Sequence, residues 1–176
     1  DRMCEMFHAN TDEDSQARIF SEFSSRSSRI RLLFSTIKLG MGVNIPDIEV
    51  VVIFGVPADS LVNLWQQVGR AARDIPHGFC LIYATRKTVN QVTEPHIKDL
   101  VDHKNTECTR SSILQGFILK GMDKENVSGQ EKHGCQYNCE DVCSCDFCLC
   151  CGNCAKKCNC PNSKSVLERI RLNPAK

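Results

Sequence analysis

The sequence predicts an α/β fold, in which a parallel sheet is flanked by helices and followed by a small helical, cysteine-rich region. Two segments, Glu49–Phe54 and Phe79–Tyr83, are apolar on both faces, as the buried strands of a parallel sheet are. Between them, Leu61–Arg73 has the apolar periodicity of a helix. Ten of the thirteen cysteines fall between Cys135 and Cys160, which sets the last part of the chain apart.

The remaining elements follow from shorter patterns. Asp12 and Asp14 precede a helical period that ends at Phe23, and Ile30–Phe34 is a short strand that leads into a loop with two glycines. Parallel sheets bind ligands beyond the carboxyl ends of their strands, so we expect the ligand-binding residues in the loops that follow the strands. Further helices are expected over residues 86–101, 108–119 and 163–172.

Charge and apolar run length bear on two kinds of partner, nucleic acid and membrane. The 22 basic and 21 acidic residues nearly cancel, so no global field favours a membrane or nucleic acid. The longest apolar stretch, Val50–Val56, is far shorter than the roughly 20 residues that a membrane span needs. We therefore expect no membrane partner. Because the chain begins with Asp1 instead of Met, we also expect it to be a piece of a longer protein.

The cysteines are expected to bind metal. A disulfide framework staples a whole small domain, whereas here the first hundred residues carry the apolar runs of an ordinary fold, and thirteen is an odd number. Metal thiolates in a reducing compartment are therefore favoured over disulfides. Two Cys-x-x-Cys pairs, Cys145–Cys148 and Cys151–Cys154, place sulfurs at the spacing that tetrahedral zinc needs, with Zn–S bonds of about 2.3 Å.

Two segments have the chemistry of phosphate binding. In Gln66–Asp74, Arg70 and Arg73 are three residues apart and would share one helical face. Their guanidinium groups suit a transferring phosphoryl group, although a pair of surface salt-bridging arginines is the alternative. In Thr36–Pro46 two glycines allow a tight backbone whose amides can cradle phosphate or sugar oxygens, although such a pair is more often a simple turn.

Taken together, these segments resemble motifs V and VI of superfamily 2 helicases, and specifically the RecQ family of DNA helicases. Thr36–Pro46 is similar to T-x-x-x-G-M-G-[VI]-[DN]-x-P, and Gln66–Asp74 is similar to Q-E-x-G-R-A-G-R-D. Phe7-His8-Ala9 looks like the strand-end histidine segment of the family. The chain departs from the pattern at three positions, Lys38, Gln67 and Ala72.

The resemblance implies a division into three parts. Residues 1–95 would be a second RecA-like lobe that is incomplete at its N-terminus. Residues 96–160 would be a zinc-binding subdomain with extra cysteines, and residues 161–176 would be a tail. ATP with Mg²⁺ would lie between this lobe and a first RecA-like lobe, because no Gly-x-x-x-x-Gly-Lys-[Ser/Thr] segment occurs in the 176 residues.

The resemblance also implies roles for individual residues. Arg73 would be the arginine finger, Arg70 a second phosphate contact, and Gln66 a bridge between nucleotide and motor loop. The other implied residues are four that contact nucleotide (Gly69, Asn44, Gly42 and Gly40) and three that contact DNA (Thr36, Lys38 and Met41).

One or two Zn²⁺ ions are expected. Cys108–Phe117 is similar to the C-x-R-x-x-L-L-x-x-F helix that supplies the first thiolate of the RecQ zinc site. The site expected from this resemblance comprises Cys108, Cys139, Cys145 and Cys148. A second site would draw on Cys150 or Cys151, with Cys154, Cys158 and Cys160. Cys135 and Cys143 are further candidates, and the Cys-x-Cys steps permit thiolates that bridge two metals.

The expected function is therefore that of an ATP-dependent 3′–5′ DNA helicase, acting on single-strand/duplex junctions in the nucleus, in repair and recombination. Two alternatives remain open. One is a helicase-derived module that binds DNA or protein without catalysis. The other is a metal-storage tail similar to metallothionein.

Overall fold

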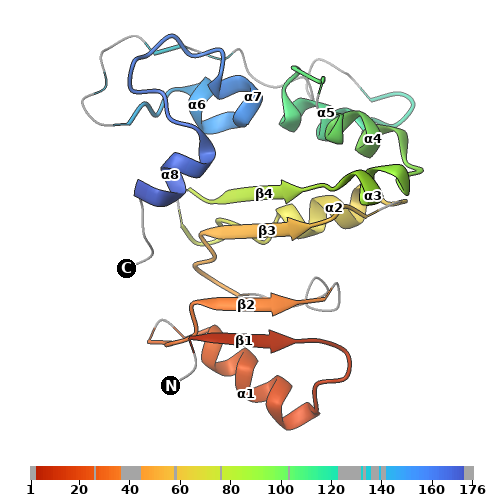
Figure 1. Cartoon of the computed structure of the whole chain (residues 1–176), viewed down its shortest axis with the longest axis vertical. Helices are drawn as coiled ribbons and strands as arrows, with labels where there is room; N and C mark the ends of the chain where they lie inside the picture. Colours follow the sequence, from red (N-terminus) through yellow and green to blue (C-terminus); the bar gives the residue numbers. More distant parts are fainter. Residues whose placement is uncertain are drawn as a thin grey trace. The chain divides into compact units, whose positions relative to one another are not determined.

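A computed structural model describes the chain over residues 3–25, 27–36, 45–57, 59–75, 77–102, 104–122, 132, 134–135, 139 and 142–172. Its elements, drawn in Figure 1, are β1 (Cys4–Phe7), α1 (Glu13–Phe23), β2 (Leu32–Ser35), β3 (Val50–Phe54), α2 (Leu61–Val68), β4 (Phe79–Tyr83), α3 (Arg86–Asn90), α4 (Pro95–Val101), α5 (Thr109–Gln115), α6 (Asp146–Cys150), α7 (Gly152–Ala155) and α8 (Val166–Leu172). The chain divides into two compact units. One comprises residues 1–51 and 66–80, and the other residues 52–65 and 81–176.

Parallel strand pairing, the central expectation, is confirmed. β1 and β2 are parallel, with Cys4 opposite Leu32 and Phe7 opposite Ser35. β3 and β4 form a second two-stranded sheet, whose arrows point the same way in Figure 1. Within the described residues, two small parallel sheets thus stand where the sequence predicted one.

Helix α1 begins where the sequence predicted. The Asp12 side chain accepts a hydrogen bond from the Ser15 N–H at 2.9 Å, which satisfies one of the donors that a helix start leaves open. Ile19 is buried, and α1 contacts β1. Arg18 reaches Glu5 of β1 with an Nη2–Oε1 distance of 3.1 Å, which pairs the buried carboxylate of that strand. The first unit therefore carries a helix fixed to its sheet by both packing and charge.

The second unit is built around short helices. Leu64 of α2 and Ile97 of α4 are fully buried, and α4 contacts α5. Gly116, directly after α5, allows a close approach, because a Cβ there would lie 2.2 Å from Leu61 Cδ2. The Trp65 ring lies 6.1 Å from that of Phe117, so α2 and the end of α5 share one apolar contact surface. No helix of the described residues has the length and apolar character of a membrane span.

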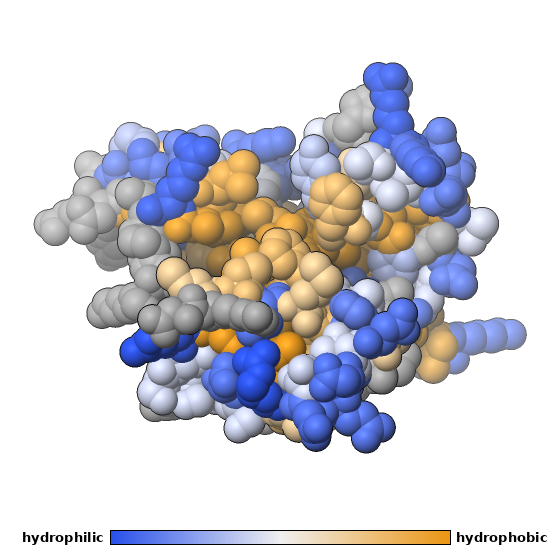
Figure 2. Space-filling view, turned by 60° about the horizontal axis from the view of Figure 1, so that its bottom comes forward, coloured by the Kyte–Doolittle hydropathy of each residue, from blue (hydrophilic) through white to orange (hydrophobic). Residues whose placement is uncertain are grey.

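The strands expected to be buried on both faces are only partly buried. Val52 and Phe54 of β3 are 60% and 81% exposed, and Phe54 stacks on Tyr83 of β4 with ring centroids 5.3 Å apart. Met6 and Phe34 of the other sheet are also exposed, and Figure 2 shows apolar side chains at the surface. A two-stranded sheet has few neighbours to cover its faces, which explains the difference from the pattern of a full parallel sheet.

An arginine loop and three cysteine groups

The segment that carries both predicted phosphate-binding arginines is a loop. The sequence predicted a helix over Leu61–Arg73, but α2 ends at Val68 and turns follow it. Gly69 comes next, a residue type common at helix ends, and Ala72 has a φ of 56°, which a right-handed helix cannot contain. The expectation that Arg70 and Arg73 share a helical face is therefore wrong. They belong instead to the arginine loop, residues 69–75.

The arginine loop is fixed to the start of the sheet. Ala72 N–H donates to Ile48 O at 3.0 Å, and Phe79 N–H donates to Glu49 O at 2.7 Å. Residues 48 and 49 directly precede β3, and Phe79 is the first residue of β4. The loop therefore lies at the amino ends of these strands, and not at the carboxyl ends where the sequence analysis placed the ligand-binding residues. The reason is that α2 leads the chain back from the end of β3 to its start, as a parallel crossover must.

The two guanidinium groups of the loop interact. Burial, and secondly the positive charge of Arg73, lower the pKa of Arg70. Arg73 is exposed, and its Nε donates to Gly69 O at 3.3 Å. The positive charges of neighbouring guanidinium groups repel each other, and an anion bound to both would stabilise both. Gln66 is exposed on the last turn of α2, so the structure brings four of the predicted residues, Gln66, Gly69, Arg70 and Arg73, into one short segment.

The predicted glycine loop is described only at its start. Thr36 follows β2, and its N–H donates to Phe7 O at 3.2 Å, which extends the pairing of β1 with β2. The other five predicted residues of this loop lie outside the described residues: Lys38, Gly40, Met41, Gly42 and Asn44.

The cysteines of the second unit gather in three groups of four. All thirteen cysteines lie within the described residues. The Cys108 group comprises Cys108, Cys150, Cys151 and Cys154. The Cys135 group comprises Cys135, Cys139, Cys143 and Cys160. The Cys145 group comprises Cys143, Cys145, Cys148 and Cys158, so Cys143 is a member of two groups. In each group the four Sγ atoms lie within 4.8 Å of one another.

These spacings fit tetrahedral metal sites. Four sulfurs bonded at about 2.3 Å to one zinc ion are about 3.8 Å apart. The Sγ–Sγ distances are 3.5 Å for Cys108–Cys150, 3.4 Å for Cys135–Cys139 and 3.6 Å for Cys145–Cys158. The groups could each hold a zinc ion with little rearrangement.

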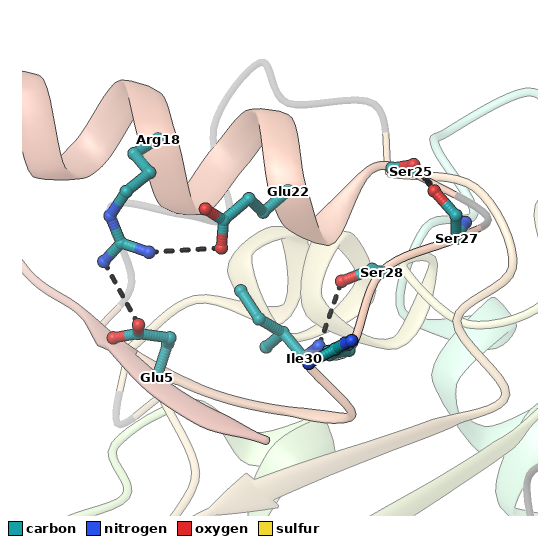
Figure 3. Close-up of a pocket in the computed structure, with 8 residues that line it drawn as sticks. Glu5, Arg18, Glu22, Ser25, Ser27, Ser28 and Ile30 are labelled. Carbon is teal, nitrogen blue, oxygen red and sulfur yellow. Dashed lines mark hydrogen bonds and ion pairs between the residues drawn. The ribbon is translucent and has the colours of Figure 1, made fainter. Parts of the chain in front are cut away.

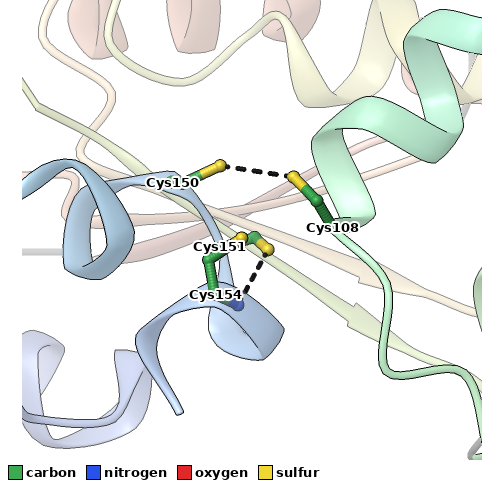
Figure 4. A group of neighbouring side chains, drawn as sticks. All are labelled: Cys108, Cys150, Cys151 and Cys154. Carbon is green, nitrogen blue, oxygen red and sulfur yellow. Dashed lines mark hydrogen bonds between the residues drawn. The ribbon is translucent and has the colours of Figure 1, made fainter. Parts of the chain in front are cut away.

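The Cys108 group takes its thiols from the starts of α5 and α7, from the end of α6 and from within α7 (Figure 4). Cys108 precedes α5 and accepts from the Ser111 N–H, while Cys151 precedes α7 and accepts from the Cys154 N–H. The Lys132 ammonium lies 3.0 Å from Cys108 Sγ and 3.1 Å from Cys154 Sγ, so a cation already fits against these thiols. Burial raises the pKa of Cys108, but the hydrogen bonds from Lys132 and the Ser111 N–H outweigh it and lower that pKa to about 6. Cys108 therefore favours the thiolate, the form that binds metal, whereas burial raises the pKa of Cys150 and Cys154 in the same group.

The partition of ligands differs from the expected one. Cys108 lies with Cys150, Cys151 and Cys154, and not with Cys139, Cys145 and Cys148. The physical reason is α6, in which Cys148 and Cys150 are two residues apart and so point to opposite sides of the helix. Each of the two therefore joins a different group. The second expected set is divided as well, because Cys158 and Cys160 belong to separate groups.

A pocket in the first unit contains none of the predicted site residues (Figure 3). Arg18 bridges Glu5 and Glu22 there, with N–O distances of 3.1 Å to each. The hydrogen bond to Glu5 raises the pKa of Arg18. Since the guanidinium is already paired with two carboxylates, it offers little attraction to a phosphate.

Comparison with known proteins agrees with the resemblance seen in the motifs. The family described as helicase conserved C-terminal domain matches residues 1–74, which include the arginine pair. The chain is 30% identical over 126 residues to RecQ-like DNA helicase blm-1 of Caenorhabditis elegans, covering 70% of this chain and 12% of that protein. The chain is a relative of the RecQ-family helicases.

Two fungal helicases support the same relationship. ATP-dependent helicase SGS1 of Saccharomyces cerevisiae is 30% identical over 177 residues, covering 98% of this chain and 11% of that protein. ATP-dependent DNA helicase hus2/rqh1 of Schizosaccharomyces pombe is 33% identical over 154 residues, covering 77% of this chain and 11% of that protein. This RecQ relative thus spans about a tenth of the length of these proteins, and its first 74 residues match the helicase C-terminal domain.

Proposed function

We propose that this chain is the second motor lobe and zinc-binding region of an ATP-dependent DNA helicase that unwinds DNA in the 3′–5′ direction. The lobe would extend over residues 1–95, the zinc-binding region over residues 96–160 and a tail over residues 161–176. The match of residues 1–74 to the helicase C-terminal domain and the names of the relatives support the motor assignment. The observation that carries it is the arginine loop, in which Arg70 and Arg73 are close enough for the charge of Arg73 to lower the pKa of Arg70.

The two arginines of the loop and Gln66 of α2 each have a proposed task. Arg73 is the arginine finger, since it is exposed and its Nε is anchored to Gly69 O. Arg70 is the second phosphate contact, and its partial burial strengthens its attraction to an anion. Gln66 extends from the last turn of α2 beside them. ATP with Mg²⁺ would supply the phosphoryl group and its neutralising cation, and most of their ligands would belong to a first RecA-like lobe.

The zinc-binding region has a structural task. We assign one Zn²⁺ to the Cys108 group, because its thiols come from the start of α5 and from α6 and α7, far apart in sequence. Holding these elements together contributes folding free energy, as closed thiolate sites do. The proposed partner is DNA at a junction of single strand and duplex, and the proposed location is the nucleus, in repair or recombination.

Substitution of Arg73 in the intact protein tests the motor assignment. Arg73→Ala should lower DNA-stimulated ATP turnover by about 10³–10⁵-fold, the contribution of an arginine finger, and leave DNA binding within twofold. Arg86→Ala, which removes an exposed arginine at the start of α3, is the matched control and should keep full turnover. Retained turnover in the Arg73 variant would overturn the assignment. Duplexes with a 3′ or a 5′ single-stranded tail then test the direction of unwinding.

A further inference from the structure

We propose that seven cysteines of the second unit hold two zinc ions in one binuclear centre, in which the Cys143 thiolate bridges both ions. The centre is additional to the zinc site assigned to the Cys108 group and does not depend on the motor function. Its ligands are Cys135, Cys139, Cys143, Cys145, Cys148, Cys158 and Cys160.

The geometry of a shared corner carries the proposal. The Cys135 group and the Cys145 group each contain four mutually close sulfurs, and Cys143 is a member of both. Cys143 Sγ lies 3.8 Å from Cys158 Sγ. Two sulfurs bonded to the same tetrahedral zinc ion are expected to be about 3.8 Å apart. Two tetrahedra that share one corner have seven corners. The two groups together supply seven sulfurs, and the shared corner is Cys143.

The bridging residue is held from several directions. Cys143 is fully buried, and its N–H donates to Asn162 O at 2.9 Å. The Asn162 side chain donates to Cys139 O, so one residue fixes the backbone of both a bridging and a terminal ligand. The Arg169 guanidinium donates to Cys143 O from α8. The chain beyond the last cysteine therefore holds Cys143 at the point where both ions need it.

Charge gives independent support. Arg169 is only 7% exposed, and within the described part of the chain its hydrogen bonds go to the carbonyl oxygens of Lys164 and Cys143. A buried charge is costly unless an opposite charge accompanies it. Seven thiolates with two zinc ions carry a net charge of about −3, since each four-thiolate zinc site alone carries −2 and one thiolate is shared. An anionic centre beside Arg169 supplies the opposite charge that its carbonyl acceptors do not.

The spacing favours single ions over an iron–sulfur cluster. Thiolate-only tetrahedral sites bind either zinc or iron–sulfur clusters. Four sulfurs within 4.8 Å of one another enclose room for one ion, and no space for the added irons and sulfides of a cluster. A thiolate shared between neighbouring zinc ions also requires no inorganic bridge.

Cadmium-113 NMR of the full 176-residue chain tests the bridge directly. The chain is purified with zinc, which is then exchanged for ¹¹³Cd. We expect three cadmium ions per chain, with two resonances split by coupling to each other through the shared sulfur and one unsplit resonance from the Cys108 group. Absence of that coupling, or iron in the purified protein, would overturn the proposal. A coupled pair without the third resonance would support the centre while refuting the zinc assignment of the Cys108 group.

Substitutions provide a second readout by metal analysis. Cys143→Ala should remove both ions of the centre, so that zinc content falls from three ions to one. Cys135→Ala and Cys145→Ala each remove a ligand from one group only and should each cost one ion. Cys80→Ala changes a thiol that belongs to none of the groups and should leave all three ions bound. If the Cys143 variant loses only one zinc ion, or none, Cys143 does not bridge two ions.

Discussion

Ala72 gives the sharpest test of the arginine loop, because it is a non-glycine residue with a φ of 56°. The left-handed region costs an L-residue roughly 1–2 kcal/mol, and glycine avoids that cost. Glycine also loses more conformational entropy on folding, which costs roughly 0.5–1 kcal/mol. Ala72→Gly should therefore raise the free energy of unfolding by about 0.5–1 kcal/mol, which corresponds to about 1–4 °C in Tm for a chain of this size.

The assay is thermal unfolding of the chain followed by circular dichroism at constant zinc concentration, because bound metal alters apparent stability. Ala71→Gly is the matched control. Ala71 is the preceding residue, its φ is not positive, and its substitution should lower stability by roughly 0.5–1 kcal/mol. If both glycine variants lose stability to the same extent, Ala72 is not strained and the described geometry of the loop is wrong.

Further predictions concern the loop, the core, the first helix and the metal sites. Gly78→Ala should lower Tm, because the added Cβ would lie 2.7 Å from Ala72 Cβ and 2.8 Å from Ala72 N. Adding Ala72→Gly to this variant should restore only part of the lost Tm, since the contact with the Ala72 backbone N remains. Leu64→Ala removes a fully buried side chain and should cost about 2–5 kcal/mol in urea denaturation, whereas Val62→Ala at an exposed position of the same helix should cost less than about 0.5 kcal/mol. Hydrogen bonds from Ser15 lower the pKa of Asp12, so the stabilising contribution of Asp12 is present at neutral pH and is lost as the pH falls through that lowered pKa. Asp12→Ala should therefore lower Tm at pH 7, and the loss of Tm should shrink as the pH falls into the acidic range. A loss that does not change with pH would contradict this. Chelation of zinc should open residues 108–160 to protease before the rest of the chain, and unchanged resistance there would argue against structural metal.

The fold elements that were predictable are those set by local sequence. The apolar run of β3, the periodicity of α2 up to Val68 and the Asp12 cap of α1 depend on neighbouring residues, and all three are present. The sequence analysis extended α2 to Arg73, although Gly69 directly after Val68 is a residue type common at helix ends. The left-handed backbone of Ala72 was not predictable from the residue itself. Alanine gives no warning of such a backbone, whereas glycine at that position would have indicated it.

The candidate sites show the same division. The residue types that point to phosphate and metal chemistry could be recognised in the sequence, because the arginine pair lies in a segment that resembles a helicase motif and Cys-x-x-Cys steps at such density favour metal binding. The division of the thiols among the three groups could not be predicted. It depends on the opposite directions in which Cys148 and Cys150 point from α6, and on Cys158 and Cys160 joining different groups. Lys132, which lies against two thiols of the Cys108 group, belongs to no motif and could be found only from coordinates.

The motor assignment is tested most directly by ATP hydrolysis of the intact protein, measured with and without single-stranded DNA. A second RecA-like lobe that brings Arg73 to the nucleotide predicts turnover that DNA stimulates severalfold or more. Turnover that is absent, or that DNA leaves unchanged, would contradict the assignment and favour a module that binds without catalysis.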